Sequence, residues 1–153
     1  MANLYIHFPF CKQACHYCNF HFSTKKIDSG GMLDLINKEL KIRANEVKAP
    51  LESIYFGGGT PSMIEPKSIK SFINSIKVQF QFIPEIEITL EANPDDIDED
   101  YLLNLRSSGI NRLSLGIQSF FDEDLKLMNR AHDQKQALES INIVGKYFNN
   151  YSI

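Results

Sequence analysis

The chain has little cysteine, no excess of basic residues and no long hydrophobic run. Each absence argues against a class of protein to which the chain could belong. All three cysteines lie within eight of the 153 residues, and the formal net charge is -3. Nucleic-acid-binding domains usually carry a basic excess, so unspecific nucleic-acid binding is disfavoured. No segment approaches the roughly 18 apolar residues of a membrane span, and residues 1–11 lack the basic and apolar regions of a secretory leader. We therefore expect a cytoplasmic protein without a transmembrane segment or a nucleic-acid partner.

The sequence does contain regular apolar patterns that switch between strand-like and helix-like spacing. With 43% hydrophobic and 23% charged residues, its composition is that of an ordinary globular protein. The length of 153 residues suits one domain but is short for a closed α/β barrel. The spacing predicts strands at 4–8, 51–56, 86–90 and 112–117, with a further strand beginning at 151–153. It predicts helices at about 32–47, 66–80, 98–109, 122–128 and 134–148.

Strands and helices therefore alternate along the whole chain, and no linker divides it. This alternation predicts an α/β fold with a parallel sheet built from right-handed βαβ units. Because the fifth strand only begins, we expect the chain to be the N-terminal part of a longer polypeptide. A small open α/β sandwich that is complete in itself is the alternative.

Unusual residues follow every predicted strand. The cysteines follow the first strand, Gly57-Gly58-Gly59-Thr60 the second, Glu91 the third and Gln118 the fourth. Loops at the carboxyl ends of parallel strands converge, and active sites gather there. The sequence therefore predicts one site formed by residues that are far apart along the chain.

The stretch CKQACHYC indicates metal chemistry more than disulfide bonding. Three closely spaced thiols cannot all pair with one another, and a reducing compartment disfavours disulfides. Three thiolates in one loop can hold three irons of a cubane iron–sulfur cluster and leave the fourth iron open to a substrate or cofactor. A structural zinc site is the alternative, with three cysteines and one histidine chosen from His7, His16 and His21.

The other candidate residues each have an ordinary alternative role. The glycines can expose N–H groups to a carboxylate, amine or ribose, or simply form a tight turn; they match neither a P-loop nor GxGxxG. Glu91 can accept hydrogen bonds from a ligand or pair with Arg112. Gln118 can cap a turn, and Arg130 can be a surface charge. His7 is expected to be a packed core histidine, and no role follows for His132.

Five motifs in this order resemble the radical S-adenosylmethionine (SAM) superfamily: YIHFPFCKQACHYCNF, YFGGGTPS, LEANP, RLSLGIQSF and NRAH. They are most similar to the branch of the oxygen-independent coproporphyrinogen III dehydrogenases and the related HemW heme chaperones. The resemblance implies that residues 1–153 are the radical SAM core, the N-terminal portion of a partial (β/α) barrel with about four to five βα units.

The resemblance also implies the cofactors and their ligands. A [4Fe–4S] cluster would be held by Cys11, Cys15 and Cys18, with SAM on the open iron, and its electron would cleave SAM to a 5′-deoxyadenosyl radical. The remaining cofactor contacts implied are Tyr5 and Tyr17 along the SAM site, Gly58, Gly59 and Thr60 at its amino-acid end, and Glu91, Gln118 and Arg130 completing the pocket.

One departure separates the two subfamilies. The coproporphyrinogen dehydrogenases carry a further cysteine two residues after the third, where this chain has Phe20. That difference favours the heme-chaperone branch, which implies binding of heme and its delivery to a respiratory protein. Oxidation of a porphyrinogen in heme biosynthesis is the alternative. Either function would need an electron donor and a heme or porphyrin ligand.

Overall fold

The computed structural model describes residues 2–25 and 28–153, in which five strands form a single parallel sheet. The strands lie in sequence order and are β1 (Ala2–Phe8), β2 (Leu51–Gly58), β3 (Phe82–Ala92), β4 (Arg112–Leu115) and β5 (Tyr151–Ser152). Every neighbouring pair is parallel. The predicted strands and their parallel arrangement are confirmed, although β3 begins four residues before the predicted Ile86.

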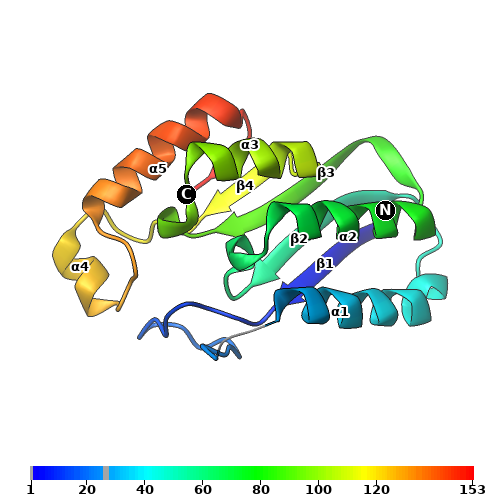
Figure 1. Ribbon diagram of the computed structural model, residues 1–153, viewed down its shortest axis with the longest axis horizontal. Coiled ribbons are helices and arrows are strands. Elements are labelled where there is room, and N and C mark those ends of the chain that lie inside the picture. Colours follow the sequence, from blue (N-terminus) through cyan, green and yellow to red (C-terminus); the bar gives the residue numbers. More distant parts are fainter. Residues whose placement is uncertain (1, 26–27) are drawn as a thin grey trace.

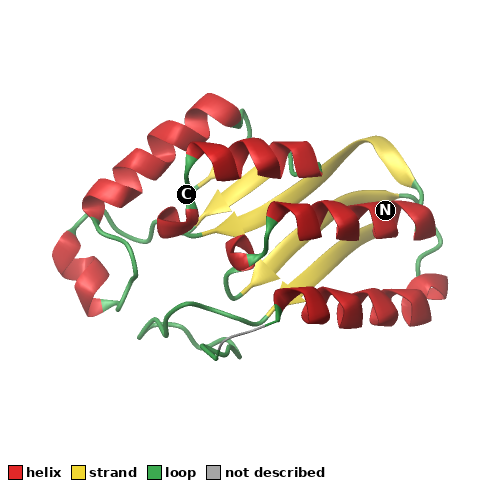
Figure 2. Ribbon diagram, viewed as in Figure 1, coloured by secondary structure: helices red, strands yellow, loops and turns green. Residues whose placement is uncertain are grey.

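Within the described residues, five α-helices and three short 3-10 helices connect the strands. The α-helices are α1 (Ser29–Arg43), α2 (Pro66–Gln79), α3 (Glu99–Ser108), α4 (Asp122–Leu127) and α5 (Gln134–Tyr147). The 3-10 helices are η1 (Ala44–Glu46), η2 (Pro61–Met63) and η3 (Pro94–Asp96). Helices α1, α2, α3 and α5 lie over one face of the sheet (Figures 1 and 2). Sequential strand order with helices on one face is typical of a barrel wall, because doubly wound sheets carry helices on both faces.

The core lies between the sheet and these helices. Ile6 and Phe8 of β1 point into it and are 2% and 0% exposed. Successive side chains of a strand point to opposite faces, so Tyr5 and His7 lie on the other face, which no helix of the described chain covers. The prediction that His7 is a core histidine is therefore wrong: it is exposed, and its Nδ1 lies 3.1 Å from the Tyr5 hydroxyl.

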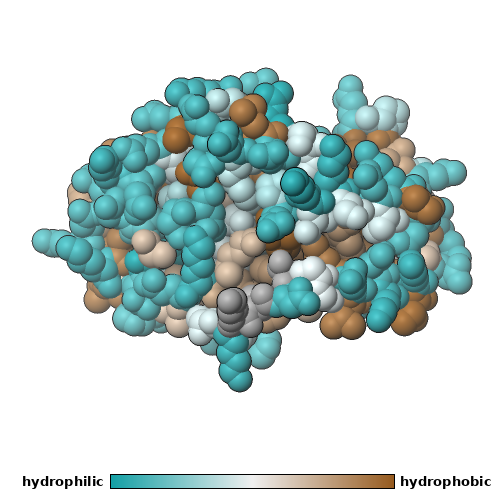
Figure 3. All heavy atoms as spheres, viewed as in Figure 1, coloured by the Kyte–Doolittle hydropathy of each residue, from teal (hydrophilic) through white to brown (hydrophobic). Residues whose placement is uncertain are grey.

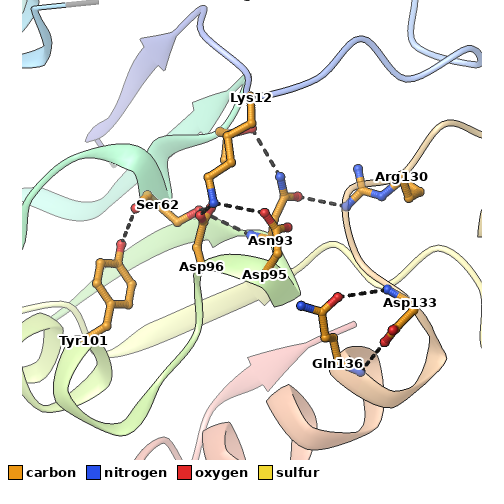
Figure 4. Close-up of polar contacts among 10 residues, drawn as sticks. Lys12, Ser62, Asn93, Asp95, Asp96, Tyr101, Arg130, Asp133 and Gln136 are labelled. Atoms are coloured by element: carbon orange, nitrogen blue, oxygen red, sulfur yellow. Dashed lines mark hydrogen bonds and ion pairs between the residues drawn. The ribbon is translucent and has the colours of Figure 1, made fainter.

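Local capping signals set several helix boundaries. The Asp98 side chain accepts from the Tyr101 N–H at 2.7 Å and begins α3, and Gly109 ends it with a φ of 104°. A capping box of Asp133 and Gln136 begins α5 (Figure 4). The predicted extension of the first helix to Val47 is wrong, since α1 ends at Arg43 and η1 follows it.

The outer surface of the helical layer is mostly hydrophilic, with apolar side chains in separate patches (Figure 3). Among the described residues, no helix is both long and apolar enough to cross a membrane. The strands point toward the side where the 9–25 loop and α4 lie, on the left of Figure 1. The candidate site is at that end.

Candidate cofactor site at the strand ends

A cavity of about 250 Å³ lies at the carboxyl ends of the strands. This is slightly below the roughly 300–1,000 Å³ of typical small-molecule sites. Ten of the eleven predicted site residues line it, and they are Cys11, Cys15, Tyr17, Cys18, Gly58, Gly59, Thr60, Glu91, Gln118 and Arg130. The sheet thus brings together residues from four separate loops, as the convergence of strand ends predicted.

The cysteines lie in the loop that follows β1. The Cys11 N–H donates to the Ser23 carbonyl at 3.0 Å, and Cys18 N–H donates to the Cys15 carbonyl at 3.1 Å, which closes the loop into a turn. All three thiols are free and half-buried. Burial raises the pKa of the Cys11 thiol, and the thiols of Cys18 and Cys15 act in the same direction, against Thr60 and Arg130. Among the described side chains, no group of three or more His, Cys, Asp or Glu is arranged so that it could hold one metal ion.

Arg130 joins the cysteine loop to the sheet. Its Nη1 donates to the Cys15 Sγ at 3.3 Å and the Tyr17 hydroxyl at 3.4 Å. Its Nη2 donates to Asn93 Oδ1 at 2.9 Å and the Gly116 carbonyl at 2.8 Å, and its Nε is buried without a partner among the described residues. Arg130 is therefore not a solvated surface charge. It places a positively charged group beside the Cys15 sulfur.

Glu91 is held at the wall of the cavity. The Tyr55 hydroxyl donates to its Oε1 at 2.8 Å, and the Gly58 N–H donates to its Oε2 at 3.1 Å. Arg112, the alternative partner, lies near Glu87 instead, with Nε 4.0 Å from Oε2. Burial raises the pKa of the Tyr55 hydroxyl, and the Glu91 carboxylate raises it further. The Tyr55 hydroxyl thus remains a proton donor to Glu91.

The glycine run allows two backbones to approach closely. Gly59 N–H donates to the Phe8 carbonyl at 2.7 Å, and Thr60 N–H donates to the Phe10 carbonyl at 2.7 Å. The Gly58 N–H is bonded as described above. Of the two roles that the sequence left open for this run, these bonds favour the tight turn over N–H groups exposed to a ligand. A Cβ at Gly59 would lie 2.4 Å from the Phe10 oxygen, so only glycine fits against the cysteine loop.

Gln118 reaches the cavity from an unusual backbone conformation. Its φ is 69°, in the left-handed region that non-glycine residues rarely adopt. The preceding Ile117 carbonyl accepts from Ser119 N–H at 2.9 Å and lies 3.1 Å from the His132 Nε2. His132, for which the sequence suggested no role, is 3% exposed and so supports this turn from within the protein.

His132 makes stability dependent on pH. Burial lowers its pKa, and the positive charge of Arg130 lowers it further, so the unfolded chain takes up a proton before the folded one as pH falls. Stability should therefore fall below about pH 6.5, the ordinary value for histidine. Urea unfolding from pH 7.5 to 5.0 should give a shallower decline for His132→Gln than for the unsubstituted chain. Parallel declines for both proteins would contradict this expectation.

Lys12, next to the first cysteine, anchors the loop on its other side. Its Nζ lies 2.9 Å from Asp95 Oδ2 and also pairs with Asp96 (Figure 4). The Ser62 hydroxyl donates to Asp96 Oδ2 at 2.5 Å, and the Tyr101 hydroxyl donates to the Ser62 carbonyl at 2.9 Å. This network connects the cysteine loop to η2, η3 and α3.

Replacing Lys12 with methionine should lower the free energy of unfolding by about 2 kcal/mol. The reason is that the Asp95 and Asp96 side chains, only 11% and 6% exposed, would lose their cation. Lys135→Met is the control, since its pair with Glu139 is 81% and 57% exposed and should contribute less than about 0.5 kcal/mol. Equal effects of the two substitutions in chemical denaturation would count against the anchoring role.

Comparison with known proteins decides the family. The family model described as the radical SAM superfamily matches residues 5–153. The chain belongs to the radical SAM superfamily. Members of this superfamily use SAM and an iron–sulfur cluster. The three cysteines of this chain line one cavity together with seven of the eight other predicted residues.

The chain spans well under half of the length of the curated relatives it matches. The heme chaperone HemW of Buchnera aphidicola subsp. Schizaphis graminum is 34% identical over 154 residues, covering 99% of this chain and 41% of that protein. The heme chaperone HemW of Haemophilus influenzae is 37% identical over 148 residues, covering 92% and 39%.

Solved structures support the same radical SAM fold. The Escherichia coli coproporphyrinogen III oxidase HemN, described as a radical SAM enzyme, superimposes with a TM-score of 0.83 at 29% identity, covering 97% of this chain and 35% of that one. Native anSMEcpe with bound AdoMet superimposes with a TM-score of 0.65 over 97% of this chain and 42% of that one. At 18% identity, the second likeness shows the fold alone.

Two differences from the predicted radical SAM site remain. Tyr5 does not line the cavity; it is 56% exposed on the uncovered face of the sheet, with its ring stacked 6.0 Å from that of Tyr55. Conversely, Lys12, Gln13 and Asn93 line the cavity although the sequence had suggested no specific role for them. Their positions inside the motifs CKQAC and LEANP were the available signal.

Proposed function

We propose that this chain holds a [4Fe–4S] cluster through Cys11, Cys15 and Cys18 and binds SAM beside it. The observation that carries the proposal is the placement of all three thiols on one cavity together with Glu91 and Arg130. Three free cysteines in one loop suit a cubane, because each would bind a different iron and leave the fourth iron open to SAM. When bound, the cluster supplies the electron for reductive cleavage of SAM.

The other residues would bind and orient SAM. Glu91 presents carboxylate oxygens that accept hydrogen bonds from an amine or from ribose hydroxyls. Gln118 and Tyr17 offer neutral polar groups at the cavity, and the Thr60 hydroxyl lies deeper, since Thr60 is 3% exposed. Arg130 would hold its guanidinium group beside the Cys15 sulfur. Tyr5 would contribute from the uncovered face of the sheet, beside Tyr55, rather than from the cavity.

We place the chain in the heme-chaperone branch, as the radical SAM core domain formed by residues 1–153. Phe20 supports this choice because it occupies the position of the fourth cysteine in the coproporphyrinogen dehydrogenases. Phe20 is 73% exposed and lines the cavity, where an apolar heme or porphyrin could contact it. The curated relatives named above, both heme chaperones, support the same branch.

Anaerobic reconstitution with iron and sulfide tests the cluster. The expected result is about four irons and four sulfides per chain and an EPR signal of the reduced protein that changes when SAM is added. Zinc retained in place of iron and sulfide would overturn the proposal in favour of a structural zinc module.

The choice of branch is tested on the reconstituted chain. Hemin binding without SAM-dependent oxidation of coproporphyrinogen III would support the chaperone branch, and oxidation of coproporphyrinogen III would overturn it.

A further inference from the structure

The middle of the cysteine loop lies against the C-terminal end of α4, more than 100 residues away in the sequence. The Gln13 Nε2 donates to the Asn129 carbonyl at 2.8 Å and to its Oδ1 at 2.9 Å. The Asn129 Nδ2 donates in return to the Ala14 carbonyl at 2.7 Å. These reciprocal bonds connect two residues between the first and second cysteines to a single asparagine.

His16 adds two more contacts between the same segments. Its N–H donates to the Met128 carbonyl at 3.0 Å, and its Nδ1 lies 2.9 Å from the Leu127 carbonyl. A carbonyl only accepts, so Nδ1 carries the proton in this contact. The last carbonyls of a helix have no partner within the helix, and His16 supplies the donors that they lack.

Asn129 has a backbone conformation that explains how α4 ends. Its φ is 56°, and its N–H donates to the Lys126 carbonyl at 3.0 Å. The next N–H, that of Arg130, donates to the Leu125 carbonyl at 2.9 Å. This pair of bonds is a Schellman motif, in which glycine is the usual left-handed residue. Glycine would suit the backbone but has no amide group, so the side chain of asparagine serves a separate purpose.

We propose that Asn129 is a positioning residue that holds the cysteine loop in its cluster-binding conformation before any metal binds. It acts through Gln13 and Ala14, while the adjacent Arg130 contacts the Cys15 thiol. The loop is then already ordered when the cluster binds, so cluster binding does not have to order it. This inference rests on the proposed cluster-binding function.

Hydrogen exchange of the cluster-free chain tests the positioning role, using Asn129→Gly. This substitution keeps the left-handed backbone conformation favourable and removes only the amide. Amides at 14–18 should exchange about tenfold faster in the variant, because two side-chain hydrogen bonds are lost. Asn104→Ala is the control, since it removes an exposed amide that donates to the Asp100 carbonyl in α3. Unchanged exchange at 14–18 in Asn129→Gly would overturn the proposal.

A second pair of variants covers the case in which Asn129→Gly weakens the whole fold. Gln13→Ala breaks the same contact from the loop side and should speed exchange at 14–18 alone; no change there would overturn the proposal. Asn129→Asp keeps an acceptor for Gln13 but no donor to Ala14, and should restore part of the protection.

Cluster assembly gives an independent readout of the same role. Iron incorporation into Asn129→Gly should be about tenfold slower than into the unsubstituted chain, while the final EPR spectrum stays the same. A change in exchange without any change in assembly rate would overturn the positioning role. If the unsubstituted chain forms no cluster, the proposed function fails, whereas the exchange comparison still reports whether Asn129 orders the loop.

Discussion

Cys15→Ala should abolish cluster assembly. The iron content after anaerobic reconstitution should fall from about four atoms per chain to a small remaining amount. The variant removes one of three ligands and also the sulfur that accepts from Arg130 Nη1 at 3.3 Å. Arg130 keeps its bonds to Asn93 and Gly116, so the fold should persist. Iron and sulfide analysis, with circular dichroism for folding, measures both expectations.

The matched control for this experiment is Thr24→Ala, an exposed position in the same loop. It should bind as much iron as the unsubstituted chain. A folded Cys15→Ala variant with full iron content would show that the cysteines are not the ligands we propose. Equal zinc binding by the Cys15→Ala and Thr24→Ala variants would likewise show that the Cys15 thiol is not a metal ligand.

Gly59→Ala should lower the free energy of unfolding by about 3 kcal/mol, the upper range for overpacking a close contact. A Cβ there would lie 2.4, 2.7 and 2.8 Å from the Phe10 oxygen, nitrogen and carbonyl carbon. These are backbone atoms, which cannot rotate away as a side chain can. Relief therefore requires the cysteine loop to move away from β2, with loss of the Gly59–Phe8 and Thr60–Phe10 hydrogen bonds.

Chemical denaturation of Gly59→Ala beside Gly145→Ala measures this effect. Gly145 lies inside α5, and the nearest atom to an added Cβ is the Tyr151 hydroxyl at 3.5 Å, an ordinary contact. Alanine there should stabilise the protein by about 0.5 kcal/mol, because glycine is unfavourable within a helix. Similar small changes for both variants would show that the cysteine loop is not held against the glycine run.

The order and type of the elements could be predicted from the sequence because each carries a local signal. Asp98 and Gly109 bound α3 as predicted. The apolar run at 4–8 and the alternating residues at 86–90 lie in β1 and β3, each of which pairs in parallel with β2. Boundaries were less accurate where tertiary contacts decide them. The first helix breaks into η1 after Arg43, and β3 begins at Phe82, ahead of Pro84.

The candidate site could be predicted to a large extent because its residues follow successive strands. Ten of the eleven predicted residues line one cavity, and only Tyr5 lies elsewhere. The partners of those residues could not be predicted. That Arg130 contacts Cys15, or that Lys12 pairs with Asp95, depends on side chains separated by 115 and 83 residues.

The sequence by itself determined the parallel α/β order, the grouping of three thiols in one loop and the placement of polar residues at strand ends. These follow from local periodicity and from the rule that carboxyl ends of parallel strands converge. Only the tertiary structure decided how the loop is held. It showed that Asn129 hydrogen-bonds to one part of the cysteine loop, that Lys12 in this loop pairs with η3, and that the glycine N–H groups are already bonded. Such contacts depend on the closeness of distant backbones, which no local pattern encodes.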